Sequence, residues 1–303
     1  MVGRAIIQYI GAPEGALPTE EPYHPLWNAS SEGWVYGKTL NPEAYRDAYT
    51  ALTTPEEEIK RYVLVPTQVH IIGKDGKQTG LGWAVNNISF AFTSPEPIIG
   101  MAVKAANENG WPTEIPGTIH MPQNPPAPWN YTFSDQPNPN VGEVGTSVIQ
   151  ANKGEVVEII FQNTWDLSGV SDIHQWHIHG HSFWVVGEGP GTFDPDTDPA
   201  TYNLENPVLR DTVSQWPLGW TALRIKLNNP GVWFCHCHIL PHLSMGMAFA
   251  FVVQADEIED YFVEAESVQY CMESDLEQPV DAGSAVSVYT ALWILGCVVL
   301  FVG

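Results

Sequence analysis

Apolar and polar positions alternate in short segments between residues 61 and 253, and this period of two predicts β-strands. The predicted strands occupy residues 62–72, 83–90, 154–163, 209–213, 220–227, 230–234 and 247–253. Turn residues separate them, and two longer stretches rich in proline, 107–142 and 187–207, are expected to be surface loops. The pattern predicts an all-β fold, with about eight strands in a Greek-key β-sandwich.

The first 60 residues have a different pattern. Residues 5–10 are apolar enough to form one strand, whereas residues 11–60 lack periodicity and are typical of a linker. Two short helices are expected within that linker. One starts at Asn41 and runs to Tyr49, and the other starts at Thr54, where a capping residue precedes proline and acidic residues.

The C-terminal end changes composition twice. Residues 257–284 are acidic and polar, whereas residues 285–303 are apolar and carry no charge. The second segment predicts a hydrophobic helix that spans a membrane, with a removable GPI-attachment signal as the alternative. The expected organisation is therefore a remnant strand plus linker (1–60), a β-sandwich domain (61–256), an acidic tail (257–284) and a membrane-directed segment (285–303).

Two histidine-rich segments carry the candidate chemistry, and strand geometry decides which side chains meet. Successive side chains on a strand point to opposite faces. The first segment starts at His174 and the second at Cys235. One face is therefore expected to collect four imidazoles, from His177, His179, His236 and His238. The other face collects the thiol of Cys237 and the imidazole of His174, and the loop after Pro241 can return His242 and a methionine to it.

Two histidines, one cysteine and a weak axial methionine form the ligand set of a blue-copper site. His174, Cys237 and His242 are the expected trigonal ligands and Met247 the axial one, with Met245 as a competing choice. Zinc is the rival metal, but it prefers four strong ligands and gains nothing from a thioether. The four imidazoles on the opposite face suit a second copper cluster, and Cys237 links the two faces through its backbone.

The two motifs, His-x-x-His-x-His-Gly-His and His-Cys-His-x-x-x-His-x-x-x-x-Met, resemble the C-terminal cupredoxin domain of multicopper oxidases, in particular ascorbate oxidases and plant-type laccases. The resemblance implies that His177 binds a type 2 copper and that type 3 coppers are bound by His179, His236 and His238. It places His174, Cys237, His242 and Met247 on the type 1 copper. Gln175 departs from the proline usual in the family. Cys235 is expected to be a buried packing residue and His181 a supporting one.

An absence limits this resemblance. The family completes its trinuclear cluster with eight histidines, and four of them come from two His-x-His pairs in an N-terminal domain. The other histidines of this chain, His24, His70 and His120, are isolated. The N-terminal part of such a protein is therefore expected to be missing from this sequence, and Cys271 is expected to lack the N-terminal disulfide partner that the family provides.

Composition narrows the remaining function classes. The formal net charge of −23 argues against nucleic acid as a partner. Three glycosylation sequons start at Asn28, Asn87 and Asn130 and favour an extracellular or cell-surface location, although the first residues do not form a secretory signal.

Three hypotheses follow from the sequence. The first is a copper-dependent oxidoreductase that takes electrons from a phenol, an ascorbate-like reductant or a metal ion and reduces dioxygen to water. Cys237, His236 and His238 would then carry the electrons. The second is a stand-alone blue-copper electron carrier, and the third is a non-catalytic remnant. An axial thioether lowers a blue-copper potential, so an ascorbate-oxidase-like potential is expected.

Overall fold

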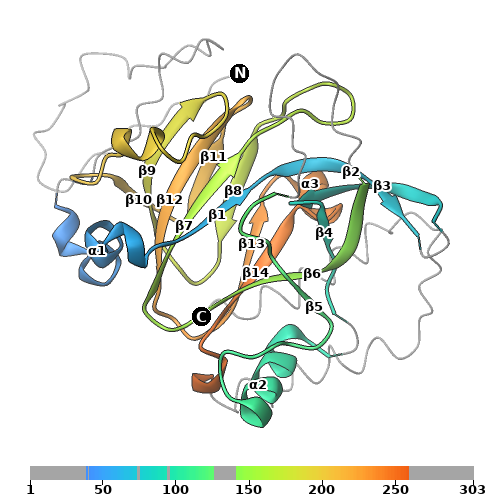
Figure 1. Cartoon of the computed structure of the whole chain (residues 1–303), viewed down its shortest axis with the longest axis horizontal. Helices are drawn as coiled ribbons and strands as arrows, with labels where there is room; N and C mark the ends of the chain where they lie inside the picture. The colour runs from blue at the N-terminus through green and yellow to red at the C-terminus, as the bar shows by residue number, and fades with distance from the viewer. Residues whose placement is uncertain (1–38, 40, 74–75, 94–95, 126–140, 259–303) are drawn as a thin grey trace, which may run out of the picture. The chain divides into compact units, whose positions relative to one another are not determined.

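The computed structural model describes residues 39, 41–73, 76–93, 96–125 and 141–258, all within one compact unit, residues 37–303. Two β-sheets dominate this unit (Figure 1). The five-stranded sheet has the order β1 (Lys60–Leu64), β7 (Glu155–Gln162), β12 (Gly219–Leu227), β9 (Phe183–Pro190) and β10 (Val208–Arg210).

The nine-stranded sheet carries both histidine-rich segments. Its path runs β11 (Thr212–Gln215), β8 (His174–Ile178), β13 (Gly231–Cys237), β14 (Ala248–Val253), β6 (Val141–Ala151), β2 (Pro66–Ile72), β3 (Gln78–Val85) and β4 (Ile88–Phe90). A short strand, β5 (Thr118–His120), also pairs with β6. The all-β prediction is therefore confirmed.

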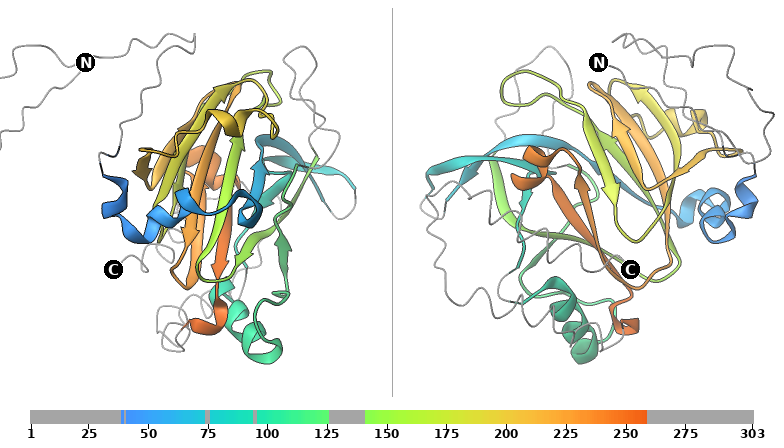
Figure 2. Two further views of the ribbon diagram at one scale, coloured as in Figure 1. Left: turned by 60° about the vertical axis from the view of Figure 1, so that its left-hand side comes forward. Right: turned by 180° about the vertical axis from the view of Figure 1, so that it is seen from behind.

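The two sheets face each other and bury aromatic side chains between them (Figure 2). Phe161 of β7 stacks on Trp176 of β8, with ring centroids 4.2 Å apart and planes 8° from parallel. Both residues are fully buried. This contact fixes β8 from the inside, because Trp176 lies between His174 and His177 and anchors the strand from which they project.

The segment expected to be a linker is packed against the five-stranded sheet. Its helices are η1 (Pro42–Ala44), α1 (Arg46–Thr53) and η2 (Glu56–Glu58). Ala51 and Leu52 of α1 are buried, and Trp184 Nε1 donates a hydrogen bond to the Ala48 carbonyl at 2.7 Å. The helix expected from Thr54 is a single 3₁₀ turn, whereas the segment starting at Arg46 forms a two-turn α-helix.

A buried ion network joins the same segment to the sheet. Glu158 is fully buried and accepts hydrogen bonds from Arg224 Nε at 2.9 Å and from Arg61 Nε at 2.5 Å. Arg224 also pairs with Glu56 of η2. Removing one member of such a network leaves an uncompensated buried charge, so the network couples η2 to β7 and β12.

Four further predictions of elements differ from the structure. Residues 83–90 form a hairpin, not one strand, because Asn86 and Asn87 adopt φ angles of +48° and +66° and reverse the chain. Residues 209–213 are divided between β10 and β11, which belong to different sheets. The expected loop 107–142 contains the end of α2 (Ile98–Asn109) and all of β5. The expected loop 187–207 contains the end of β9 and η3 (Asp198–Thr201).

Helix α2 closes one end of the nine-stranded sheet. Its buried residues Ile98, Ala102 and Val103 join a core cluster with Val252 of β14 and Ala255 of η4 (Ala255–Glu257). Pro97 precedes the helix, and Gly110 ends it with a φ of +81°. The residues at the two ends of this helix are therefore typical of helix boundaries, although the sequence pattern did not predict the helix.

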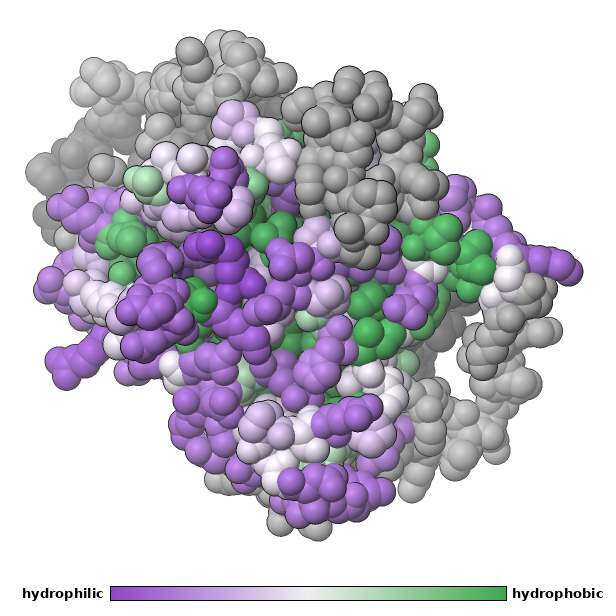
Figure 3. All heavy atoms as spheres, in the orientation of Figure 1, coloured by the Kyte–Doolittle hydropathy of each residue, from purple (hydrophilic) through white to green (hydrophobic). Residues whose placement is uncertain are grey.

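Most of the molecular face in Figure 3 is polar, and apolar side chains gather toward the end of the molecule where β2 and β3 lie. Leu81 of β3 and Val141 of β6 are among the exposed large apolar residues. Several predictions concern residues outside the described ranges: the strand 5–10, the sequons at Asn28 and Asn130, the tail with Cys271, and the segment 285–303. Within the described ranges, no helix has the length and apolar character needed to cross a membrane.

Candidate metal centre

The two histidine-rich segments lie side by side as the antiparallel strands β8 and β13. Their register pairs His236 with His177 and Cys237 with Trp176. Beyond the paired region, the main-chain N–H of His179 donates to the Phe234 carbonyl at 2.9 Å. The pairing of odd residues on one strand with even residues on the other produces the predicted division of side chains between two faces.

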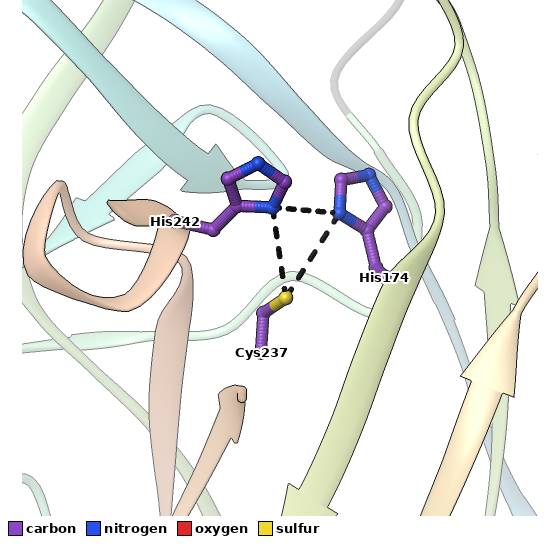
Figure 4. A group of neighbouring side chains, drawn as sticks. All are labelled: His174, Cys237 and His242. Atoms are coloured by element: carbon purple, nitrogen blue, oxygen red, sulfur yellow. Dashed lines mark hydrogen bonds between the residues drawn. The ribbon is translucent and has the colours of Figure 1, made fainter. Parts of the chain in front are cut away.

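The first face gathers the thiol of Cys237 with two imidazoles (Figure 4). The Cys237 Sγ atom lies 4.0 Å from His174 Nδ1 and 3.7 Å from His242 Nδ1, and the two nitrogens are 3.1 Å apart. All three residues are buried. His242 reaches the face from α3 (Leu240–Ser244), a short helix that follows β13 directly.

The spacing of these three atoms fits a trigonal metal site. Metal bonds of about 2.0 Å to nitrogen and 2.3 Å to sulfur, at trigonal angles, imply an N···N distance of about 3.5 Å and an N···S distance of about 3.7 Å. Two imidazole Nδ1 atoms that face each other also repel unless a proton or a cation lies between them. The mixed sulfur and nitrogen donors select a soft first-row metal, so this set fits copper.

Burial sets the protonation of this face. It lowers the pKa of His174 to about 3, with help from the neighbouring His242, so the ring is neutral and able to bind a metal. Burial also raises the pKa of the Cys237 thiol. Formation of the thiolate ligand therefore needs the charge of a bound cation.

Met247 is fully buried and tied to two of the three candidate ligands through its backbone. Its N–H donates to the His242 carbonyl at 3.0 Å, and its carbonyl accepts from the Cys237 N–H at 3.1 Å. The predicted axial residue is thus held in the same local structure as the trigonal set.

The β3–β4 hairpin braces the loop that carries these ligands. Trp83 N–H and Ser89 Oγ both donate to the Met245 carbonyl, at 2.8 Å and 3.0 Å, and Phe90 N–H donates to the Gly246 carbonyl at 2.9 Å. Gly246 has a φ of +103°, and a Cβ there would come within 2.9 Å of Phe90 N. The loop can approach the hairpin this closely only because Gly246 has no side chain.

Trp83 was missed from the sequence as a neighbour of the metal centre. Its ring packs on His242 with centroids 4.2 Å apart and lies edge-on to His174 at 5.5 Å. Only 6% of Trp83 is exposed, so it shields both imidazoles from water. Trp83 lies about 90 positions before the first histidine motif. Strand pairing brings it to the metal centre, so no local sequence pattern could predict its position.

The second face gathers four of the five remaining imidazoles of the two motifs, those of His177, His179, His236 and His238. Neighbouring ring centroids are 4.9 to 6.0 Å apart, and the Nε2 atoms of His179 and His236 are 3.2 Å apart. Burial and the neighbouring imidazoles lower the pKa of His179 to about 4. Burial likewise lowers the pKa of His236 to about 3. Both rings are therefore neutral and keep a lone pair available for a metal.

Hydrogen bonds orient two of these rings. The Nδ1 atom of His177 lies 2.9 Å from the Asp211 carbonyl and 3.1 Å from Thr212 Oγ1, which itself donates to Asp211 Oδ1 at 3.0 Å. The Nδ1 atom of His236 lies 3.2 Å from the Cys237 carbonyl. A carbonyl acceptor fixes the proton on Nδ1 and leaves Nε2 free to bind a metal.

This second face opens toward the surface. His238 is exposed and His177 and His179 are half-buried, whereas His236 is only 5% exposed. Of the other residues in the motifs, Cys235 is fully buried as a free thiol outside the trigonal set, and His181 packs edge-on against Trp233 with centroids 5.7 Å apart.

Comparison with known proteins identifies the family and several relatives of this chain. Residues 111–257 match the family model of multicopper oxidases. An L-ascorbate oxidase from Brassica rapa subsp. pekinensis is 38% identical over 248 residues, covering 81% of this chain and 40% of that protein. Laccase-1 from Arabidopsis thaliana is 38% identical over 172 residues, 56% of this chain and 28% of that protein.

The crystal structure of Fet3p, described as a multicopper oxidase that functions in iron import, has the same fold. It aligns with a TM-score of 0.50 and 24% identity, over 86% of this chain and 42% of that one. The family match assigns residues 111–257 to a multicopper oxidase domain. The chain belongs to the multicopper oxidase family, and it spans about 40% of the length of the L-ascorbate oxidase it matches.

Proposed function

We propose that this chain is the copper-binding C-terminal portion of a multicopper oxidase that oxidises a small reductant and reduces dioxygen to water. The type 1 ligands are His174, Cys237 and His242, with Met247 axial. His177 serves the type 2 copper, and the type 3 ligands are His179, His236 and His238. Copper bound at these two sets supplies one-electron transfer at the first and oxygen reduction at the second.

The observation that carries this proposal is the position of Cys237 between His236 and His238 on one strand. Its sulfur belongs to the buried trigonal set, and the imidazoles on either side belong to the opposite face. The backbone therefore joins the two sets covalently within three residues. A carrier with only one copper has no use for the four imidazoles of the second face.

Completion of the second set is part of the proposal. Its four imidazoles lie at a partly exposed surface, and the chain holds no second pair of the form His-x-His outside the two motifs. We infer that the remaining ligands come from a further domain, as the family resemblance implies. The reductant is a phenol, an ascorbate-like compound or a metal ion. An extracytoplasmic location, with the segment 285–303 as anchor, belongs to the same proposal.

A stand-alone electron carrier is the second candidate function. It is favoured by the exposure of the imidazole face. In the described part of the chain, moreover, only the group around Cys237 brings three potential metal-binding side chains within 4.8 Å of one another. A remnant without activity is the third candidate.

Copper loading of the purified protein distinguishes these functions. In protein purified with the domain that supplies the remaining ligands, a blue absorption band with oxygen consumption on adding a reductant supports the oxidase, and a blue band with copper at only one site supports the carrier. A protein that takes up no copper contradicts both. The Cys235→Ser variant is the control, because it removes a thiol next to the site without removing a proposed ligand.

A further inference from the structure

Gln175 follows the first proposed ligand, His174, and its main chain lies against the end of β13. The His238 N–H donates to the Gln175 carbonyl at 2.5 Å. The side chain of Gln175 is engaged elsewhere, because its Oε1 accepts a hydrogen bond from Ser214 Oγ of β11 at 2.9 Å. The main chain and the side chain of this residue therefore have separate partners.

The direction of the Gln175 N–H follows from antiparallel pairing. The N–H and C=O of one residue point to the same neighbouring strand, and opposed residues normally exchange two hydrogen bonds. Since the Gln175 carbonyl is directed at β13, its N–H is directed there too. Strand β13 ends at Cys237, however, and the chain bends away into α3, so the second bond of the exchange is not made to the His238 carbonyl.

Cys237 stands next to His238 at the end of β13, and its Sγ atom lies 4.0 Å from Nδ1 of His174, the residue before Gln175. Burial raises the pKa of the Cys237 thiol, and hydrogen bonding from the main-chain N–H groups of Ile239 and Gln175 opposes that rise. A buried thiolate that binds a metal keeps lone pairs that can accept hydrogen bonds. Main-chain N–H groups near the sulfur can donate them.

We propose that the Gln175 amide donates a hydrogen bond to the Cys237 thiolate and thereby raises the reduction potential of the blue-copper site. This inference rests on the proposed function. Gln175 is thus a positioning and tuning residue and makes no contact with the metal. In the resembled family this position is usually proline, which has no N–H to donate.

The sign of the effect follows from where the electron density lies. Oxidised copper draws density from the thiolate, and a hydrogen bond to sulfur competes for the same density. The bond therefore stabilises the reduced site more than the oxidised one. Hydrogen bonding around the cysteine sulfur is an established means of tuning such sites.

The decisive pair of variants is Gln175→Pro and Gln175→Ala. Both remove the side chain and its bond to Ser214, but only proline removes the N–H. Proline also restricts the preceding residue to extended conformations, which His174 already adopts in β8. We expect Gln175→Pro to lower the equilibrium constant for electron uptake about tenfold, or about 59 mV for one electron, and Gln175→Ala to leave it unchanged.

Redox titration of the blue band measures this difference. Equal potentials in the two variants would overturn the inference while leaving the proposed function intact. A wild-type protein that binds copper without a blue band would overturn both.

A measurement on the wild-type protein guards against misfolding of the proline variant. In protein loaded with ¹¹³Cd²⁺ in place of copper, a hydrogen bond to the metal-bound sulfur transmits scalar coupling between the cadmium nucleus and the Gln175 amide proton. Observation of that coupling supports the inference. Its absence at Gln175, together with its presence at Ile239, overturns it.

Discussion

The two faces of the β8–β13 pair share a backbone but differ in how complete they are. On the sulfur face, one chain places three donor atoms within 4.0 Å of one another, buries them and covers two of them with Trp83. On the imidazole face, neighbouring rings are about 5 to 6 Å apart and His238 is exposed. The three donor atoms of the first site are therefore organised within this chain, whereas the imidazoles of the second lie farther apart and partly exposed.

Removal of the Cys237 thiol should have the largest effect on the difference between the two faces. Cys237→Ser should abolish the blue band and lower copper affinity of the sulfur face by at least about 100-fold, because an alcohol does not replace a thiolate ligand. Copper titration followed by absorbance and mass spectrometry measures the loss. The neighbouring Cys235→Ser variant should stay blue, and a blue Cys237→Ser protein would refute the ligand assignment.

Removal of the His179 imidazole should affect copper binding at the imidazole face alone. We expect His179→Ala to lower copper binding beyond the blue site by about 100-fold and to leave the blue band in place, since His179 and His236 present their Nε2 atoms to each other. Total copper per chain and electron paramagnetic resonance report the two sites separately. His120→Ala on β5 is the control, and loss of the blue band in His179→Ala would show that the faces are not independent.

A smaller change in copper affinity should follow from loss of a hydrogen-bond partner of His177. Thr212→Val removes one of two acceptors near His177 Nδ1 while the Asp211 carbonyl remains, so copper affinity at the imidazole face should fall about tenfold. Competition with a copper chelator measures this shift. Thr79→Val, which changes an exposed strand hydroxyl on β3, should have no effect. An unchanged affinity in Thr212→Val would assign the orientation of His177 to the carbonyl alone.

Substitution of the proposed axial residue, Met247, should give the smallest change. It should alter the reduction potential of the blue site without altering the amount of copper bound. Met247→Leu should raise the reduction potential of the blue site while copper remains bound, because a thioether stabilises oxidised copper and leucine does not. Redox titration against mediators measures it. A potential that falls or stays constant would count against Met247 as the axial ligand.

Strand periodicity made the face assignment predictable. His177, His179, His236 and His238 share a face because their spacing is two, and the structure shows them together. The same reasoning failed at Asn86 and Asn87, where strong strand formers on both sides hid a turn that needs positive φ angles. It also could not find Trp83 or the amide of Gln175, because both act through pairing between distant or antiparallel segments. Ligand roles beyond the geometry remain predictions.

The brace between the β3–β4 hairpin and the Met245–Gly246 segment has a consequence for electron transfer. The hydrogen bonds at Trp83, Ser89 and Phe90 involve no proposed ligand atom, so a change in the oxidation state of a bound metal would leave them in place. A ligand loop held in this way cannot relax toward the geometry that each state would prefer. Under the proposed function, the cost of reorganisation would therefore be low, and the hairpin, nearly 160 residues before the loop that it holds, would help to determine how fast an electron moves.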